Sequence, residues 1–293
     1  MREHSVIPAV GLGTWPLRGQ ICASTVEHAL RLGYRHIDTA EAYENEREVG
    51  EALRASGVSR DDVFITTKIS PSHFMPDELK SAARDSLTRL RLPHVDLLLL
   101  HWPNAQVPLS ETLDALCEVK RAGLTRHIGV SNFEIADIAE AARHASEPLV
   151  CNQIAINSFV DRPELRAACR AHDMAVVAYS PIARGEASND AVLKRIGQAH
   201  GKSAAQVSLR WLVQQGISVI PRTSRIERLS ENYSIFDFML SDEEMAAVSS
   251  VARRRVRLST LISPLRVLAH KTLPEPAASA LRSGYRTLRR FMS

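Results

Sequence analysis

The chain has 293 residues, of which 45% are hydrophobic and 24% charged, and its net charge is +4. This is the composition of an ordinary globular protein, long enough for one large α/β domain or two smaller ones. No run reaches the ~20 apolar residues of a membrane helix, the first residues lack the apolar stretch of a signal peptide, and the four cysteines have no metal-ligand spacing. We therefore expect a cytoplasmic protein with reduced thiols and no membrane span.

The positive charge is concentrated at one end of the chain. Residues 252–293 contain ten Lys and Arg and a single acid, Glu275, so this segment carries +9 and the preceding 251 residues carry −5. Because the basic character belongs to the last segment, the body of the chain gives no reason to expect a nucleic-acid partner.

Strand-like and helix-like segments alternate along the body. The strand-like runs are continuously apolar, as in parallel strands buried on both faces. In chain order they are Pro8–Gly11, Tyr34–Ile37, Val63–Thr67, Val95–Leu100, His127–Val130, Val150–Ile154, Ala175–Tyr179 and Ile217–Ile220. Stretches with helical apolar spacing are Ser24–Leu32, Pro76–Leu90, Leu109–Ala122, Glu134–Ala145, Arg162–Ala171, Ala191–His200 and Ser203–Gln214.

The spacing of the strand ends indicates the fold. Each gap between successive strands can hold one crossover helix, and eight such units in about 250 residues predict a (β/α)8 TIM barrel. The alternative, a doubly wound sheet, normally has a G-x-G-x-x-G turn after its first strand, and the segment 11–16 lacks the third glycine. We predict a single α/β domain over residues 1–251, followed by a basic C-terminal extension over 252–293.

Four chemically active residues stand at or just after strand ends: Asp38, Tyr43, Lys68 and His101. Taken singly, each has an ordinary explanation, such as a turn aspartate, a packing tyrosine or a solvated lysine. In a parallel barrel, however, all strand ends meet at one rim, where such enzymes keep their active sites. A carboxylate, a phenol, an ammonium and an imidazole gathered there would form a centre for proton transfer.

The segments around these residues resemble the aldo-keto reductases, especially bacterial members similar to 2,5-diketo-gluconate reductases. The resemblance runs from about Val6 to Val251, and its most distinctive segments are Gly11–Trp15, Asp38–Glu46, Ile65–Lys68 and Asp96–Pro103.

The resemblance implies the roles of the four residues. Tyr43 would be the general acid that protonates a carbonyl oxygen, and a phenol needs a stabilised anion to act near pH 7. Lys68 would supply that stabilisation, and Asp38 would keep Lys68 charged. His101 would hydrogen-bond and polarise the carbonyl group.

The resemblance also implies an NADPH site. Residues expected at its nicotinamide end are Thr14, Trp15, Ser131, Asn132, Gln153, and Tyr179 with the following Ser180 and Pro181. Ser131 could equally begin the helix predicted from Glu134. At the adenosine end we expect Arg222, Thr223, Arg228, Glu231 and Asn232.

The adenosine end departs from the usual Lys-Ser of the family, because this chain has Arg222 and Thr223. Arginine keeps the cation and adds a fork suited to phosphate oxygens, so NADPH is preferred, with use of NADH left open.

The substrate is expected to be a small aldehyde, ketone or keto-sugar held by Trp15, Trp102 and Phe74, without a metal ion. We expect a monomer. The alternative function is a nucleotide-sensing subunit with little turnover, and a metal-dependent hydrolase is disfavoured because only Asp38 and His101 offer ligands at strand ends.

The family's specificity loop follows the last helix, where this chain stops resembling the family. Residues 252–293 could be a solvated extension, a divergent or frame-shifted end, or a basic amphipathic element.

Overall fold

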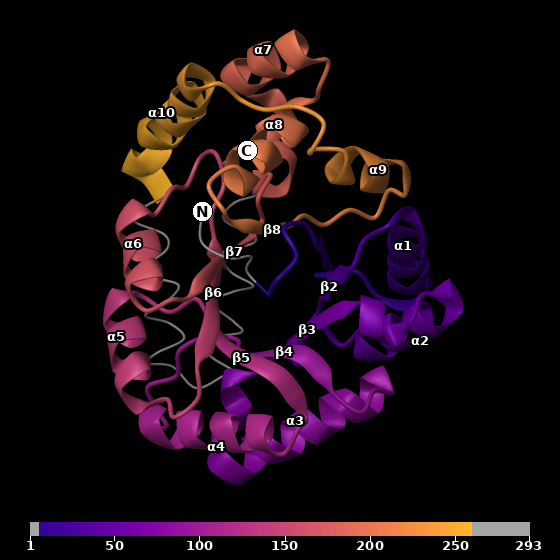
Figure 1. Cartoon of the computed structure of the whole chain (residues 1–293), viewed down its shortest axis with the longest axis vertical. Helices are drawn as coiled ribbons and strands as arrows, with labels where there is room; N and C mark the ends of the chain where they lie inside the picture. The colour runs from indigo at the N-terminus through magenta and orange to yellow at the C-terminus, as the bar shows by residue number, and fades with distance from the viewer. Residues whose placement is uncertain (1–5, 260–293) are drawn as a thin grey trace.

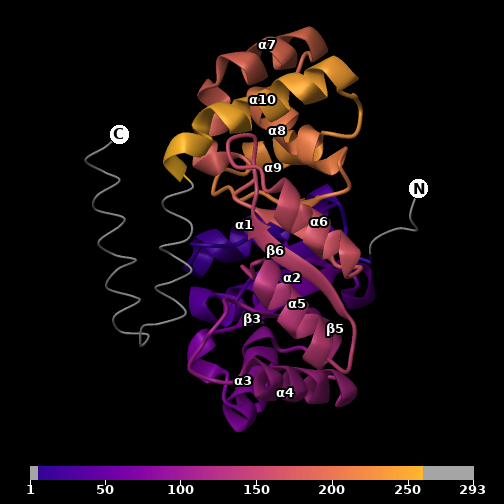
Figure 2. The ribbon, with the colours of Figure 1, turned by 90° about the vertical axis from the view of Figure 1, so that its left-hand side faces the viewer.

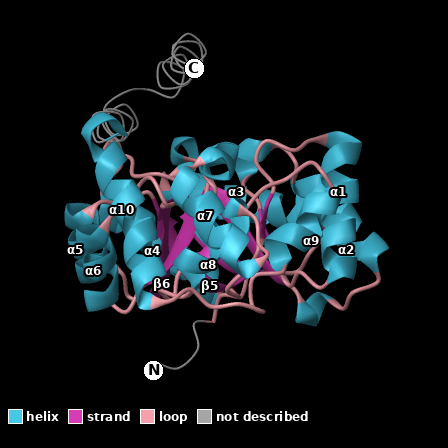
Figure 3. Ribbon diagram, turned by 90° about the horizontal axis from the view of Figure 1, so that it is seen from above, coloured by secondary structure: helices cyan, strands magenta, loops and turns pink. Residues whose placement is uncertain are grey.

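Eight parallel strands follow one another around one sheet in the order of the chain, β1 to β8. The structure is a computed structural model that describes residues 6–259, with side chains described for 6–251. The sheet closes on itself where Val10 bridges Val219 and the Gly13 amide donates to the Pro221 carbonyl. Helices surround the strands on the outside (Figures 1 and 3). The predicted (β/α)8 TIM barrel is therefore confirmed.

The strands are β1 Leu12–Gly13, β2 His36–Asp38, β3 Phe64–Ile69, β4 Val95–Leu100, β5 Thr125–Ser131, β6 Leu149–Ala155, β7 Ala175–Tyr179 and β8 Ser218–Ile220. The helices are α1 Gly19–Leu32, α2 Glu46–Ser56, α3 Pro76–Leu90, α4 Leu109–Arg121, α5 Ile135–His144, α6 Pro163–Ala171, α7 Ala191–His200, α8 Ala204–Val213, α9 Glu227–Tyr233 and α10 Asp242–Ser259. Short 3-10 turns η1 Glu41–Tyr43, η2 Arg60–Asp62, η3 Pro71–His73 and η4 Ala183–Asn189 lie between them.

Most predicted elements agree with these bounds, and the differences have local causes. The first regular strand is β1, later than the predicted Pro8–Gly11, because only Val10 of that run pairs with a neighbour. Helix α2 was not predicted, since its highly charged sequence buries only a few small and apolar side chains. Helix α10 crosses the predicted boundary at residue 251 and continues to Ser259. The rest of the basic extension, residues 260–293, lies outside the described residues.

Side chains on each strand alternate between the barrel interior and the helical layer, as the pleat requires. On β3, Thr67 points outward and donates to Glu46 of α2, so its neighbour Lys68 points inward. On β4, Leu97 and Leu99 belong to the interior cluster with residues of β6, β7 and β8, whereas Leu98 and Leu100 pack in the outer core. The alternation brings one set of side chains from every strand into the barrel.

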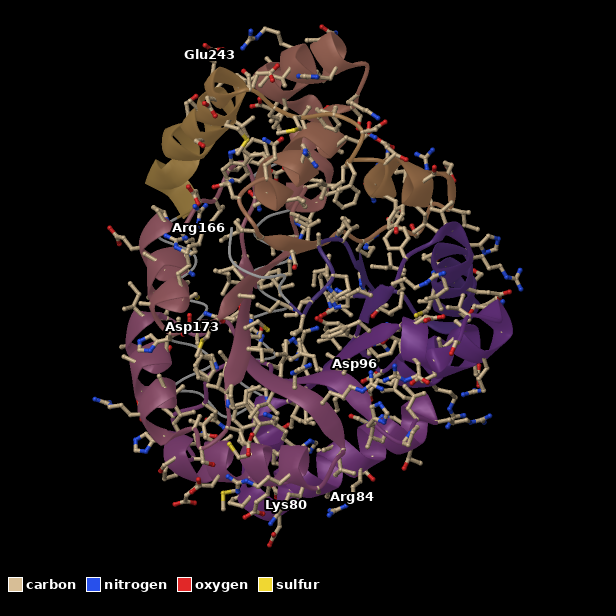
Figure 4. All side chains as sticks on the ribbon, in the orientation of Figure 1. Lys80, Arg84, Asp96, Arg166, Asp173 and Glu243 are labelled. Carbon is tan, nitrogen blue, oxygen red and sulfur yellow. The ribbon has the colours of Figure 1, made fainter. Side chains whose placement is uncertain are left out.

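Charged side chains lie both on the outer helices and, in a few buried positions, at the strands. In Figure 4, Lys80 of α3 and Glu243 of α10 lie on the periphery, whereas Asp96 lies at the strands, where it is 2% exposed. Figure 2 shows α7, α8 and α10 packed at one end of the molecule and α3 and α4 at the other. All four cysteines are buried free thiols. Over residues 6–259, no helix combines the length and apolar character needed to cross a membrane.

Candidate active site

Asp38 and Lys68 form a buried ion pair at the carboxyl ends of β2 and β3. Lys68 Nζ lies 2.5 Å from Asp38 Oδ1, and the two residues are 0% and 2% exposed, respectively. The ammonium also donates to the Thr39 carbonyl at 2.7 Å and to the Tyr43 hydroxyl at 3.4 Å. Three acceptors around one nitrogen use all three protons of an ammonium, so we assign Lys68 as charged and Asp38 as its carboxylate partner.

Tyr43 and His101 complete the group that the sequence predicts. Tyr43 ends the 3-10 turn η1 that follows β2, and the Lys68 nitrogen lies 4.9 Å from its ring centroid. The ring of His101, directly after β4, meets the Tyr43 ring edge to face at 5.5 Å between centroids. The four predicted residues therefore converge on one rim of the barrel.

The surroundings control the charges of this group. Burial acts to lower the pKa of Lys68, but the Asp38 carboxylate and the Tyr43 phenol outweigh it, so the pKa is raised. Burial raises the pKa of Asp38, against the charge of Lys68 and hydrogen bonds from Lys68 and Gln153 that lower it. Burial likewise raises the pKa of Tyr43, with Lys68 acting in the opposite direction. The phenol is therefore protonated at neutral pH.

Two residues that the sequence analysis did not single out, Asn45 and Glu41, hold the loop after β2 that carries Tyr43. Asn45 is buried and accepts from the Thr39 hydroxyl at 2.6 Å, while its amide donates to the Leu17 carbonyl at 2.8 Å. Glu41 accepts from the Ser70 amide at 2.9 Å and pairs with His73 at 2.7 Å. Asn45 and Glu41 lie within the quoted Asp38–Glu46 segment, but nothing in their spacing shows which loops they join.

Thr14 differs from its expected role. It is fully buried, and both its amide and its hydroxyl donate to the Asp38 carbonyl at 3.0 Å. The structure thus makes Thr14 a support for Asp38, with no surface left for a cofactor.

Four of the predicted nicotinamide residues form one hydrogen-bonded group: Ser131, Asn132, Gln153 and Tyr179. The Ser131 hydroxyl and the Asn132 backbone N–H both donate to the main-chain carbonyl of Gln153 at 2.9 Å. The Tyr179 hydroxyl donates to the side-chain Oδ1 of Asn132 at 2.8 Å. The Asn132 side chain in turn donates to the His101 carbonyl at 3.0 Å. Asn132 sits at φ 62, where side chains other than glycine are uncommon, and such strain is typical of functional sites.

Ser131 does not begin the following helix, contrary to the possibility raised from the sequence. Glu134 is the N-cap of α5, and it forms a reciprocal capping box with Asp137. After Tyr179, the chain turns sharply: Ser180 has φ 51, and the Pro181 carbonyl accepts from Ser208 of α8 at 2.9 Å. Ser180 and Pro181 therefore shape the loop that follows β7.

The predicted adenosine residues lie in the loop after β8 and in α9. Arg222, Arg228 and the intervening Arg225 are exposed, which leaves a row of cations in contact with water. The hydroxyl of Thr223 is already used, because it accepts from the Arg225 amide at 2.9 Å and donates to the Arg225 carbonyl at 3.1 Å. Asn232 is buried and Glu231 partly exposed. The donor set combines cations at one end with amides and a phenol at the other, and it fits a nicotinamide dinucleotide carrying a phosphate.

Two of the three predicted substrate residues reach the rim. Trp15 is 38% exposed, and the guanidinium of Arg184 lies 5.3 Å from its ring centroid, a contact that the sequence did not predict. Trp102 follows His101 and is partly exposed. Phe74 is 1% exposed within the main apolar core, so the structure does not bring it to the substrate side. Its apolar character fits a core as well as a pocket, and only packing decides between them.

Comparison with known proteins agrees with this geometry. The model of the Aldo/keto reductase family matches residues 9–253. Methylglyoxal reductase DkgB of Escherichia coli O157:H7 is 40% identical over 248 residues, which cover 84% of this chain and 93% of that protein.

Solved structures show the same similarity. A structure described as a 2,5-diketo-D-gluconic acid reductase B has a TM-score of 0.82 at 46% identity. The alignment covers 84% of this chain and 88% of the chain in that structure. An aldo-keto reductase (AKR2E5) complexed with NADPH has a TM-score of 0.80 at 36% identity, covering 84% of each chain.

Proposed function

Since this chain belongs to the aldo/keto reductase family, we propose that it reduces small aldehydes, ketones or keto-sugars to alcohols with NADPH, using Tyr43 as the general acid. The observation that carries the proposal is the position of the Lys68 ammonium between Asp38 and the Tyr43 hydroxyl, at 2.5 and 3.4 Å. Methylglyoxal is a sensible first substrate, because it is the substrate named for the DkgB relative.

The hydrogen bonds around Tyr43 explain why it can donate a proton outward. An ammonium cannot accept a hydrogen bond, so the Tyr43 oxygen accepts from Lys68 and its own proton must point elsewhere. A carbonyl oxygen placed at the rim would receive that proton. The cation beside the phenol would then stabilise the phenolate as it forms, and burial of the pair strengthens the interaction.

His101 is the proposed partner of Tyr43 on the carbonyl. Its ring lies 5.5 Å from the phenol ring between centroids, so a substrate oxygen that accepts the Tyr43 proton would also lie close to the imidazole. A second donor at that oxygen polarises the carbonyl and orients it for reduction.

The cofactor supplies the hydride when bound. Asn132 and Gln153 would hold the nicotinamide amide, and the Tyr179 ring would lie against the nicotinamide. Arg222 and Arg228 would bind the adenosine phosphate, supported by their exposure and by the fork of the guanidinium group. Glu231 and Asn232 of α9 would meet the adenine.

The proposal is tested by consumption of NADPH with methylglyoxal or nitrobenzaldehyde, followed at 340 nm. Wild type should turn over, and Tyr43→Phe should lower kcat by about 10³-fold or more, with the Kd for NADPH nearly unchanged. Tyr34→Phe is the matched control for kcat, because that buried hydroxyl donates to the Leu229 carbonyl of α9, at the adenosine end of the site and away from Lys68 and Asp38. Turnover by Tyr43→Phe at the wild-type rate would contradict the assignment, and NADPH binding without any turnover would favour a nucleotide-sensing role.

A further inference from the structure

Gln153 contacts both the charged group of Asp38 and Lys68 and the proposed nicotinamide residues Ser131 and Asn132. It lies on β6 with 2% of its surface exposed, and its side-chain nitrogen donates to Asp38 Oδ2 at 2.7 Å. β6 and β2 are not neighbours in the sheet, so this contact spans the barrel interior. Because Lys68 occupies Asp38 Oδ1, each carboxylate oxygen of Asp38 has its own donor.

The contact fixes the orientation of the Gln153 amide. A carboxylate only accepts hydrogen bonds, so the NH2 end of the amide must face Asp38. The carbonyl end of the amide is then held on the other side of the group. Turning the amide over would place two oxygens against each other in a buried site, which is costly.

The backbone of Gln153 connects to the proposed nicotinamide residues. Its carbonyl accepts from the Ser131 hydroxyl and from the Asn132 amide, each at 2.9 Å, and Asn132 also accepts from Tyr179. A continuous series of hydrogen bonds therefore runs from Tyr43 through Lys68, Asp38 and Gln153 to Asn132 and Tyr179.

We propose that Gln153 is a positioning residue that couples cofactor binding to the charged state of the Asp38–Lys68 pair. This inference rests on the proposed function. Ionised Asp38 holds the amide so that its oxygen is presented to the carboxamide NH2 of the nicotinamide. By thermodynamic reciprocity, a cofactor that binds this orientation also favours the ionised carboxylate.

Asp38→Asn provides a direct test of the orientation. Lys68 would still require an oxygen acceptor, so the new side chain would turn its NH2 group toward Gln153. Gln153 would then have to present its oxygen to residue 38 and its NH2 to the cofactor. We expect the Kd for NADPH, measured by fluorescence titration, to rise about tenfold, the loss of roughly one hydrogen bond.

A double-mutant cycle of Gln153 and Asp38 separates their coupling from independent effects of each substitution on NADPH binding. Gln153→Met should raise the Kd for NADPH about tenfold in the wild-type background and less than about threefold in the Asp38→Asn background. Gln206→Met is the matched control, because Gln206 is a buried glutamine that caps α8 away from the site, and its Kd should stay within about twofold. Equal losses in both backgrounds would overturn the coupling. A wild-type protein that does not bind NADPH would instead overturn the proposed function.

Gln153→Glu keeps the shape of the side chain and provides a second readout if Gln153→Met does not fold. At low pH the introduced carboxylic acid can donate to Asp38 as the amide does. At higher pH it becomes an anion beside Asp38 and can no longer donate. Relative to wild type at each pH, NADPH affinity should fall about tenfold or more between pH 5 and pH 8. A ratio that does not change with pH would overturn the proposal.

Discussion

The Lys68 ammonium donates at 2.5 Å to an Asp38 carboxylate that is itself almost completely buried. A pair of this kind is weak support for stability in itself, because burial of both charges offsets much of their attraction. Removal of one partner is different, since it leaves the other charge buried without compensation.

Lys68→Met should therefore destabilise the fold by about 3–5 kcal/mol as well as abolish turnover. Urea denaturation followed by circular dichroism measures the loss. Lys80→Met is the control, because Lys80 pairs with Asp77 and Glu118 at the surface and should change the midpoint little. Equal midpoints for the two variants would show that the buried pair is not held as described.

His36 should make stability depend on pH below neutrality. Burial, with a smaller contribution from Lys68, lowers its pKa to about 3, whereas a histidine in the unfolded chain has a pKa of about 6.5. Between these two pH values His36 is protonated in the unfolded chain and neutral in the folded chain. Stability should therefore fall as pH falls from about 6.5 toward 3, by up to about 1.4 kcal/mol per pH unit.

His36→Gln should reduce that slope by about one proton, measured from urea denaturation at several pH values between 4 and 7. The variant can keep a hydrogen bond to Thr66, which His36 contacts at 3.0 Å, so the fold should survive. An unchanged slope would mean that another group causes the acid sensitivity.

Gly50 should tolerate no side chain at all. A Cβ at this position of α2 would lie 2.1 Å from the Leu90 carbonyl oxygen at the end of α3, and the obstacle is backbone that cannot move aside. Gly50→Ala should cost more than about 2 kcal/mol of unfolding free energy.

Gly57→Ala is the comparison for Gly50→Ala. At Gly57 the position has φ 74 but nothing within 4 Å, so only backbone strain of about 1 kcal/mol is expected. Thermal denaturation distinguishes the two glycines. A smaller loss at Gly50 than at Gly57 would contradict the close approach of α2 and α3.

Arg222 should determine the preference for NADPH over NADH. Its exposed guanidinium is available to a phosphate, so Arg222→Gln should reduce the ratio of the two kcat/KM values about tenfold or more. Arg225→Gln is the control, because Arg225 already pairs with Glu227 at 2.7 Å. A larger effect at Arg225 than at Arg222 would transfer the phosphate contact to Arg225.

The sequence by itself determined the architecture and singled out four polar residues that the barrel brings to one rim. Continuous apolar runs separated by helical spacing can be satisfied by parallel strands inside a layer of helices, and strand ends then meet at one rim. For that reason Asp38, Tyr43, Lys68 and His101 could be selected before their distances were known. Helix α2 escaped detection because its charged residues hide a narrow apolar stripe.

The tertiary structure alone decided which side chains meet. Closure of the barrel brings the Gln153 side chain across the interior to Asp38, and packing puts Phe74 in the core. The Thr14 hydroxyl donates to the main-chain carbonyl of Asp38. These partners lie on different strands and loops, so no local propensity or spacing specifies them. Residue types and periodicity reveal what chemistry a rim can hold, but hydrogen-bond partners depend on the register and curvature of all eight strands together.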